Sequence, residues 1–349
     1  MRVLWIPIFS MRSHETGKYS ILKDGNFQLT MARVLASNFD QVVVAVPVGA
    51  ADFDEVLERF KDHTRVSFVC LEYGLNAVET RERFWELNAD MIWALDRLSD
   101  FVITDITGYN GEKPFANNFN ITKLPELDRP YIDRFFESDL NSIERGAFTT
   151  VLNPRQREYI LEVRPDLVDK VFVNTKCVHA SMLPKIDPPH KTEAERQKIF
   201  WPFRISDKAY KFDQFIDVFD ELNLSGRGWT IETTDPNDSM KHERAYIGKM
   251  KPTKSEYYEL LAKRPVVVML DDIDTVLHPG TIEFFHYGCP VVTYNADLIR
   301  NPNTIVHLSE IGARLNSLSY NEVEIGRFRF AEGETDAFYN KVFCRVKSN

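Results

Sequence analysis

Short apolar runs that read as β-strands alternate with longer amphipathic segments along most of the chain. Residues 2–9 and 41–48 are expected strands, and a helix is expected at 26–37 between them. A second series starts with a strand at 198–201 and continues into a helix at 210–222. Strands separated by helix-length segments favour parallel pairing, with the helices packed against the sheet. The sequence therefore predicts an α/β fold with doubly wound parallel sheets.

Two such series indicate two domains, because 349 residues exceed what a single hydrophobic core usually organises. We expect a Rossmann-like domain over residues 1–183 and a second one over 190–334, joined by the segment PKIDPP at 184–189. An amphipathic C-terminal helix is expected over 335–349. The further predicted elements are strands at 66–71, 101–104, 149–152, 170–174, 229–233, 266–270 and 290–294, and helices at 52–62, 77–98 and 254–263.

Two segments of the first half carry additional expectations. Within the helix at 77–98, the spacing of Trp85 and Trp93 predicts that both side chains pack into the core. Residues 107–134 are rich in Gly, Pro, Asn and aromatic residues and are predicted to form a long loop. Loops of that length in a domain are usually functional or mobile.

Composition limits the classes of protein that fit. Hydrophobic residues make up 44% of the chain and charged residues 27%, as in globular proteins, and no apolar run is long enough to span a membrane. The four cysteines, Cys70, Cys177, Cys289 and Cys344, are far apart, which favours reduced, buried thiols in a cytoplasmic protein. The net charge of −9 argues against a general polyanion binder.

Positive charge is nevertheless concentrated in two segments. Residues 170–211 hold nine Lys and Arg against four Asp and Glu, and residues 241–264 hold seven against three. An anionic ligand is expected near these segments, although any solvated face could have the same composition.

The stretch PVVVMLDDIDTVLHPGTIEFFHYGCPVVTY at 265–294 reads as a strand, an acidic loop, a short helix and another strand. The helix is expected to begin at about Gly280 and Thr281, with Glu283 in its first turn. The N–H groups at such a helix start can hold a phosphate, and a carboxylate one turn in can accept from both ribose hydroxyls. We therefore expect a nucleotide pocket. In the simpler alternative, Glu283 only complements the helix dipole.

A group of cations follows the strand at 198–201. Arg204, Lys208 and Lys211 lie where this strand gives way to a helix. Cations at the carboxyl end of a strand can neutralise a diphosphate leaving group. The alternative is a solvated basic helix start, although cations there oppose the helix dipole unless an anion binds.

Several short motifs resemble bacteriophage DNA β-glucosyltransferases. Phe203-Arg204 with a cation four residues later, followed by FDQFIDVF, resembles the diphosphate-binding segment of that family. The segment FVITDI at 101–106 resembles the strand that ends in its catalytic aspartate, which falls on Asp105. The other matching motifs, in the family's order, are Arg129-Pro130-Tyr131, Tyr246-Ile247-Gly248-Lys249, Asp271-Asp272 and Thr281-Ile282-Glu283.

The resemblance implies the GT-B architecture of glycosyltransferases, in which two doubly wound Rossmann-like domains face a central cleft. The sequence departs from the family at Gly280, which stands where the family has an arginine, and at Pro202, which replaces a small residue. The related signature of retaining GT-B enzymes has a glutamate where this chain has Thr275. These departures leave the donor sugar and the stereochemical outcome open.

The resemblance also implies roles for individual residues. Asp105 would act as general base on an acceptor hydroxyl, Arg204 and Lys208 would stabilise the diphosphate of a UDP-sugar, and Glu283 would hold the ribose. Asp271 or Asp272 would contact the donor sugar or a divalent metal such as Mg²⁺ or Mn²⁺. The complete set expected to bind the nucleotide sugar is Arg204, Lys208, Lys211, Lys249, Asp271, Asp272, Gly280, Thr281 and Glu283.

The acceptor favoured by the resemblance is a 5-hydroxymethylated pyrimidine in phage DNA, modified in the host cytoplasm after the base leaves the stack. The residues expected to contact the acceptor are Glu15, Lys113, Phe115, Arg129 and Tyr131. Three alternatives stay open: a GT-B transferase acting on a glycan or small molecule, a non-catalytic nucleotide-sugar binding protein, and a structural helix-cap role for Asp105. A dinucleotide oxidoreductase is disfavoured, because no Gly-x-Gly-x-x-Gly motif follows a strand.

Overall fold

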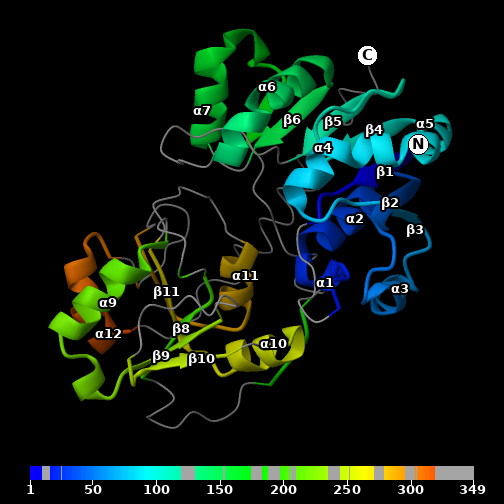
Figure 1. Cartoon of the computed structure of the whole chain (residues 1–349). Helices are drawn as coiled ribbons and strands as arrows, with labels where there is room; N and C mark the ends of the chain where they lie inside the picture. The colour runs from blue at the N-terminus through cyan, green and yellow to red at the C-terminus, as the bar shows by residue number, and fades with distance from the viewer. Residues whose placement is uncertain are drawn as a thin grey trace. The chain divides into compact units, whose positions relative to one another are not determined.

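The computed structural model describes two α/β units (Figure 1). Unit 1 comprises Met1–Met182 with Phe330–Asn349, and unit 2 comprises Leu183–Arg329. The described residues are 1–9, 16–24, 26–118, 130–151, 154–173, 183–187, 197–203, 205, 210–234, 244–250, 252–270, 279–294, 303 and 305–318. The helix predicted at 335–349 lies outside them. None of the helices in these ranges is long and apolar enough to cross a membrane.

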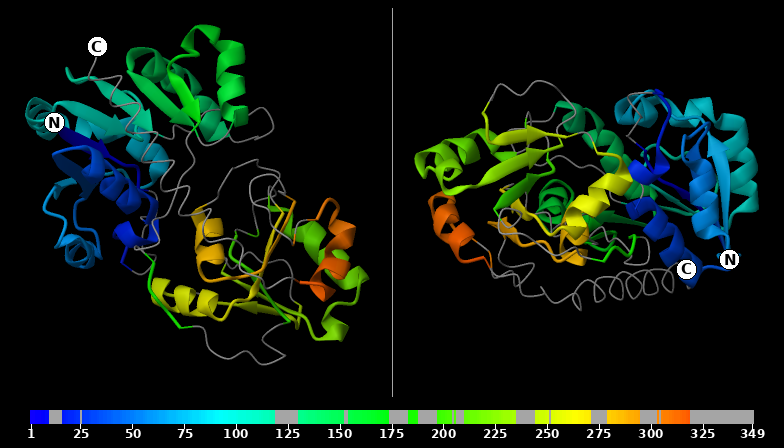
Figure 2. Two further views of the ribbon diagram at one scale, coloured as in Figure 1. Left: turned by 180° about the vertical axis from the view of Figure 1, so that it is seen from behind. Right: turned by 90° about the horizontal axis from the view of Figure 1, so that it is seen from below.

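Unit 1 is built on a seven-stranded sheet in the order β3-β2-β1-β4-β5-β6-β7, and every neighbouring pair is parallel (Figure 2). The strands are β1 (Arg2–Ile6), β2 (Gln41–Pro47), β3 (Val66–Leu71), β4 (Phe101–Thr104), β5 (Phe115–Asn118), β6 (Phe148–Val151) and β7 (Val171–Val173). The chain winds outward from β1 to β3 and then returns to place β4 beside β1. The β1–β4 boundary is thus the switch point of a doubly wound sheet.

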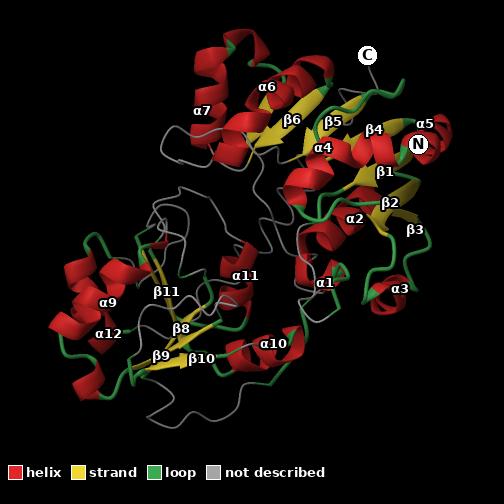
Figure 3. Cartoon of the chain, viewed as in Figure 1, coloured by secondary structure: helices red, strands yellow, loops and turns green. Residues whose placement is uncertain are grey.

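The helices of unit 1 connect successive strands (Figure 3). They are α1 (Ile21–Asp24), α2 (Asn26–Asn38), α3 (Phe53–Phe60), α4 (Ala77–Leu87), α5 (Ala89–Leu98), α6 (Pro130–Arg145), α7 (Pro154–Val163) and the 3₁₀ turn η1 (Pro165–Leu167). Helices that connect parallel strands cover both faces of the sheet, so its central strands β1 and β4 are largely apolar and buried.

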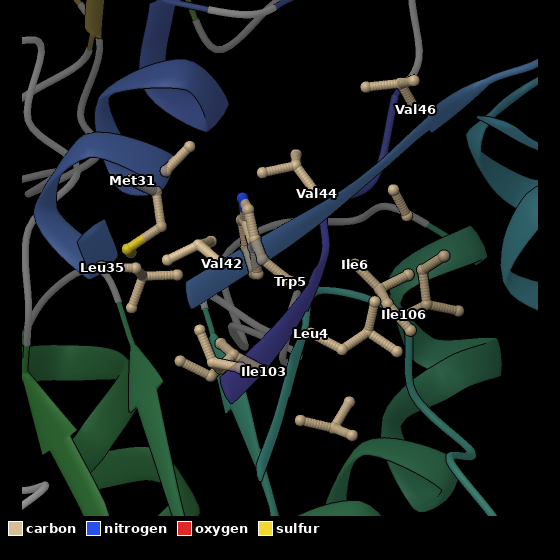
Figure 4. Close-up of a cluster of buried hydrophobic side chains, with 14 of the residues drawn as sticks. Leu4, Trp5, Ile6, Met31, Leu35, Val42, Val44, Val46, Ile103 and Ile106 are labelled. Carbon is tan, nitrogen blue, oxygen red and sulfur yellow. The ribbon is translucent and has the colours of Figure 1, made fainter. Parts of the chain in front are cut away.

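The central strand β1 shows this directly. Trp5 points toward α2, where its indole N–H donates to the Gln28 carbonyl at 3.4 Å, and it lies with Met31. Leu4 and Ile6 point to the other face (Figure 4). All three β1 side chains are fully buried. The core of unit 1 therefore lies on both sides of β1.

Unit 2 repeats the arrangement on a smaller scale. Its five-stranded parallel sheet has the order β10-β9-β8-β11-β12. The strands are β8 (Lys198–Trp201), β9 (Thr230–Thr233), β10 (Ile247–Lys249), β11 (Val266–Met269) and β12 (Val291–Thr293). The helices are α9 (Phe212–Glu221), α10 (Lys254–Ala262), α11 (Pro279–His286) and α12 (Ile311–Asn316). Two 3₁₀ turns, η4 (Ser225–Arg227) and η5 (Leu308–Glu310), complete the described elements. The switch point of this sheet is the β8–β11 boundary. The predicted pair of doubly wound parallel sheets is thus confirmed.

One predicted helix is two helices. The segment expected to be continuous from 77 to 98 divides at Asn88 into α4 and α5. The Asn88 amide donates to the carbonyls of Phe84 and Glu72, and its carbonyl oxygen accepts from the Glu72 N–H. This side chain competes with the helical hydrogen-bond pattern and ends α4.

The division changes the environment of one tryptophan. Trp93 on α5 is 64% exposed and carries the Arg97 guanidinium 4.8 Å from its ring centre, so the prediction that it packs into the core is wrong. Trp85 on α4 is half-buried and donates to the Thr107 carbonyl at 2.7 Å.

The predicted loop at 107–134 contains regular structure. Strand β5 lies inside it, and α6 begins at Pro130. The sequence of β5, FANN, contains two asparagines, which are depleted in strands, and so gives little strand signal. The expectation of one long loop is therefore wrong.

Candidate functional site

The carboxyl end of β4 in unit 1 carries Asp105, the residue expected to be the general base. Its backbone N–H donates to the Ile6 carbonyl at 2.9 Å, so the residue directly after β4 is tied to the last residue of β1. Asp105 is 5% exposed. Because β1 and β4 meet at the switch point, Asp105 stands where ligands of doubly wound sheets bind.

Hydrogen bonds fix the orientation of this carboxylate. The Asn118 amide donates to Asp105 Oδ1 at 3.2 Å, and the Ile8 backbone N–H makes a longer contact of 3.4 Å to Oδ2. Thr150 donates in turn to the Asn118 carbonyl oxygen at 2.9 Å. A row of polar side chains therefore runs from β6 through the end of β5 to Asp105.

Asn118 and Thr150 were not anticipated from the sequence. They are directly opposite each other in the β5–β6 register, and both are buried. The available signal was a pair of polar residues in each strand, FANN and FTTV, in a sheet whose other strands are mostly apolar. A single sequence does not show which strands are neighbours, so it did not connect these residues with Asp105.

The loop that leaves β1 is fixed on the same edge of the sheet. The Tyr73 hydroxyl donates to the Pro7 carbonyl at 2.9 Å. Burial raises the pKa of Tyr73 well above its ordinary value, and the nearby Asp105 carboxylate raises it further. Tyr73 is therefore a neutral hydrogen-bond donor beside Asp105.

Two of the five predicted acceptor residues, Lys113 and Phe115, lie away from the edge of the sheet that carries Asp105. Lys113 lies two residues before β5, at the amino edge of the sheet, whereas Asp105 follows the carboxyl end of β4. Phe115 is a core residue, 6% exposed, whose ring centre lies 4.9 Å from that of Tyr109. The structure therefore separates these two residues from the Asp105 edge, because parallel strands place their two ends on opposite edges. Glu15, Arg129 and the side chain of Tyr131 lie outside the described residues.

In unit 2, Glu283 lies on α11, which begins at Pro279 with Gly280 as its second residue. The Glu283 side chain is nearly buried and accepts at Oε1 from the Lys254 ammonium and from the Tyr258 hydroxyl, each at 3.1 Å. Both donors belong to α10. Burial raises the pKa of Tyr257, the neighbour of Tyr258, with a further contribution from the Glu283 carboxylate. The sequence did not predict this contact between α10 and α11.

The connection after β8 is anchored to α11 by aromatic contacts. Phe203 is buried, stacks on Tyr210 with ring centres 4.9 Å apart, and meets Phe284 edge-on at 6.3 Å. Phe203, the residue before Arg204, thus lies beside the helix that carries Glu283.

Two of the predicted lysines can be placed. Lys211 precedes α9 in a left-handed conformation, with φ 55°, and its ammonium lies 5.0 Å from the ring centre of Tyr294, directly after β12. Lys249 is exposed at the carboxyl end of the edge strand β10. These residues lie on the carboxyl-edge side of the unit 2 sheet.

The remaining predicted donor residues cannot be assigned contacts. Arg204, Lys208, Asp271, Asp272 and the side chain of Thr281 lie outside the described residues. Within the described parts of the chain, no group of three or more His, Cys, Asp or Glu side chains could hold a metal ion.

Solved structures share this fold across nearly the whole chain. HepE from Anabaena in complex with UDP-glucose aligns with a TM-score of 0.59 and 10% identity, covering 100% of both chains. A glycosyltransferase from Rickettsia africae aligns at 0.57 and 12% identity, covering 99% of this chain and 96% of its own. The N-terminal domain of trehalose-6-phosphate phosphatase from Candida albicans aligns at 0.61 and 10% identity, covering 98% and 96%.

These similarities establish a two-domain Rossmann-like fold of the GT-B type. No family model and no curated protein sequence matches the chain.

Proposed function

We propose that the protein is a glycosyltransferase that moves a hexosyl or pentosyl group from a UDP-sugar to a hydroxyl acceptor, with Asp105 as general base. The observation that carries the proposal is the oriented Asp105 carboxylate at the switch point of unit 1. Similar folds that bind UDP-glucose, or that are glycosyltransferases, support the reaction class.

The chemistry follows from these groups. As the acceptor oxygen forms its bond to the anomeric carbon, Asp105 accepts the hydroxyl proton. The bond between the anomeric carbon and the diphosphate oxygen breaks, and UDP leaves with the electron pair. Asn118 and the Ile8 N–H keep the Asp105 oxygens in place, so little reorganisation accompanies proton transfer.

We assign binding of the donor UDP-sugar to unit 2. We assign the ribose to Glu283 and the diphosphate to Arg204, Lys208 and Lys211, with Gly280 and Thr281 at the start of α11. Lys249 would contact the base or diphosphate. If Mg²⁺ or Mn²⁺ takes part, Asp271 and Asp272 supply the carboxylate oxygens such ions prefer.

For the acceptor, we propose the 5-hydroxymethylated pyrimidine of duplex DNA, on the strength of the motifs shared with phage DNA β-glucosyltransferases. A glycan or small-molecule acceptor is the second candidate, and the net charge of −9 favours it. The third candidate, a nucleotide-sugar binding protein without transferase activity, would bind UDP-sugars and leave them intact.

The deciding experiment incubates the protein with hydroxymethylated duplex DNA and a panel of UDP-sugars, followed by digestion to nucleosides and mass spectrometry. UDP release is followed in parallel, with and without acceptor. Slow hydrolysis of the donor also releases UDP, so this measurement does not require that the acceptor be identified. We expect a glycosylated nucleoside from the wild type. In Asp105→Asn, the rate at which this nucleoside forms should fall by about 10²- to 10⁴-fold. Asp90→Asn, at an exposed position on α5, is the matched control.

The outcomes separate the candidates. UDP release without a modified nucleoside supports transfer to another acceptor. UDP-sugar binding without release under any condition supports the non-catalytic protein. Full activity in Asp105→Asn would show that the base has been wrongly assigned.

A further inference from the structure

Two side chains of α10, those of Lys254 and Tyr258, contact the Glu283 carboxylate. Lys254 donates to Oε1 of Glu283 at 3.1 Å and lies 3.5 Å from Oε2, and Tyr258, four residues later on the helix, donates to Oε1 at 3.1 Å. Residues four apart share one helix face, so the two donors converge on one carboxylate oxygen.

The position of Lys254 is itself constrained. Its ammonium lies 4.6 Å from the ring centres of both Tyr257 and Tyr258. The helix start is fixed by a capping box, in which Thr253 accepts from the Glu256 N–H and the Glu256 carboxylate accepts from the Thr253 N–H. The ammonium is therefore held by the helix start and by two aromatic faces, unlike an exposed pair such as Lys61 with Glu58, whose side chains are 60% and 68% exposed.

These contacts match what a ribose-binding carboxylate requires. It must be ionised to accept from two neighbouring hydroxyls, and it must already have the correct orientation when the nucleotide arrives. Lys254 supplies the compensating charge, and Lys254 and Tyr258 together fix the rotation of the carboxylate through Oε1. A purely structural ion pair would join α10 to α11 equally well but would have no effect specific to the ribose.

We propose that Lys254 and Tyr258 are positioning residues that orient Glu283 toward the ribose hydroxyls of the donor nucleotide. This inference rests on the proposed function, since it assumes that unit 2 binds a UDP-sugar. It adds a source of specificity: discrimination between ribo- and deoxyribonucleotides would depend on α10 as well as on Glu283.

The test measures the affinities of the full-length protein for UDP, 2′-deoxy-UDP and 3′-deoxy-UDP by calorimetry. The wild type is expected to prefer UDP over each deoxynucleotide by about tenfold or more, the cost of leaving a carboxylate hydrogen bond unmade. Glu283→Gln and Lys254→Met should lose most of this preference by weakening UDP binding, with little change for the deoxynucleotides. Tyr258→Phe should lose part of it, and Lys254→Arg should retain it.

Lys263→Met, at an exposed lysine after the end of α10, is the matched control and should behave as the wild type. Thermal unfolding of each variant shows whether it is folded. A Lys254→Met protein that is folded, binds UDP and retains the full preference for ribose overturns the inference, as does equal weakening for all three nucleotides.

Failure of the premise would look different. If the wild type does not bind UDP, the proposed donor site is wrong and the inference falls with it. If the wild type binds UDP but does not discriminate against the deoxynucleotides, only the role of Glu283 and its two partners is refuted.

Discussion

At the scale of single residues, the fold keeps several polar groups buried, and the Arg81–Asp139 pair is the most enclosed. It joins α4 to α6, the Asp139 side chain is fully buried, and the Arg81 guanidinium also lies 4.5 Å from the ring centre of Phe135. Burial raises the pKa of Asp139 to about 7, although Arg81 opposes the shift. Ionisation of the Asp139 carboxyl therefore lowers the free energy of unfolding, and Arg81 reduces this cost.

Replacing Arg81 with Met should cost about 3 to 5 kcal/mol at pH 8, because it leaves a buried carboxylate unpaired. A pKa that is higher in the folded than in the unfolded protein means that the folded protein binds the proton more tightly. The free energy of unfolding therefore falls as pH rises from about 4 to about 7, and in the variant, where the opposing cation is absent, the fall continues above pH 7. Urea unfolding at pH 5.5 and pH 8 measures the difference. If Arg81→Met lowered the free energy of unfolding by the same amount at pH 5.5 and at pH 8, the prediction would be contradicted.

Asn118 is the corresponding test in the proposed active site. Asn118→Ala removes the donor to Asp105 Oδ1 and should lower the rate of sugar transfer by about 10- to 100-fold. Thr150→Val, which removes the donor to Asn118, should have a smaller effect in the same direction. Initial rates of UDP release measure both, and the affinity for UDP should be unchanged. Wild-type rates in Asn118→Ala would reject a positioning role for this side chain.

At the scale of elements, most strands were predictable, and the two that were missed, β5 and β10, have little apolar sequence. Strands such as β4 and β11 consist mostly of β-branched and aromatic residues, so the local sequence alone identifies them as strands. β5 and β10 were missed because FANN and IGK owe their strand structure to their neighbours in the sheet. Tertiary pairing thus overrode local preference.

The break between α4 and α5 gives a prediction at this scale. Asn88→Ala removes three side-chain hydrogen bonds and leaves backbone groups of Glu72 and Phe84 without those partners. It should destabilise unit 1 by about 1 to 2 kcal/mol, in spite of the higher helix propensity of alanine. Urea unfolding followed by circular dichroism measures the change. A neutral or stabilising effect would show that the two helices are separated for another reason.

At the scale of the whole molecule, the sequence predicted the two-sheet architecture. It singled out Glu283 as a carboxylate at a helix start, and Asp105 through the resemblance of FVITDI to a strand of phage DNA β-glucosyltransferases, and both site assignments stay predictions. The residues that orient these two carboxylates were not predictable. Asn118 and Thr150 approach Asp105 through strand order, and Lys254 and Tyr258 approach Glu283 through the packing of α10 on α11. Both depend on contacts between segments distant in the chain.

The assignment of the donor to unit 2 predicts where UDP stabilises the protein. At 100 times its dissociation constant, a ligand contributes about 2.7 kcal/mol to the folded state. Amide hydrogen exchange with and without UDP should show the largest gain in protection in α10 and α11, and uridine alone should give a smaller gain. The largest gain in β1 and β4 of unit 1 would reverse the assignment.

Each unit carries a tryptophan with no exposed surface in the first strand of its sheet, Trp5 in β1 and Trp201 in β8. Indole emission shifts to the blue in an apolar environment and is quenched by collision only when a solute can reach the ring. Proteins that retain only Trp5 or only Trp201 would therefore report the opening of one core at a time. Trp93 on α5, which is 64% exposed, would supply the reference for a solvent-accessible indole in the same chain.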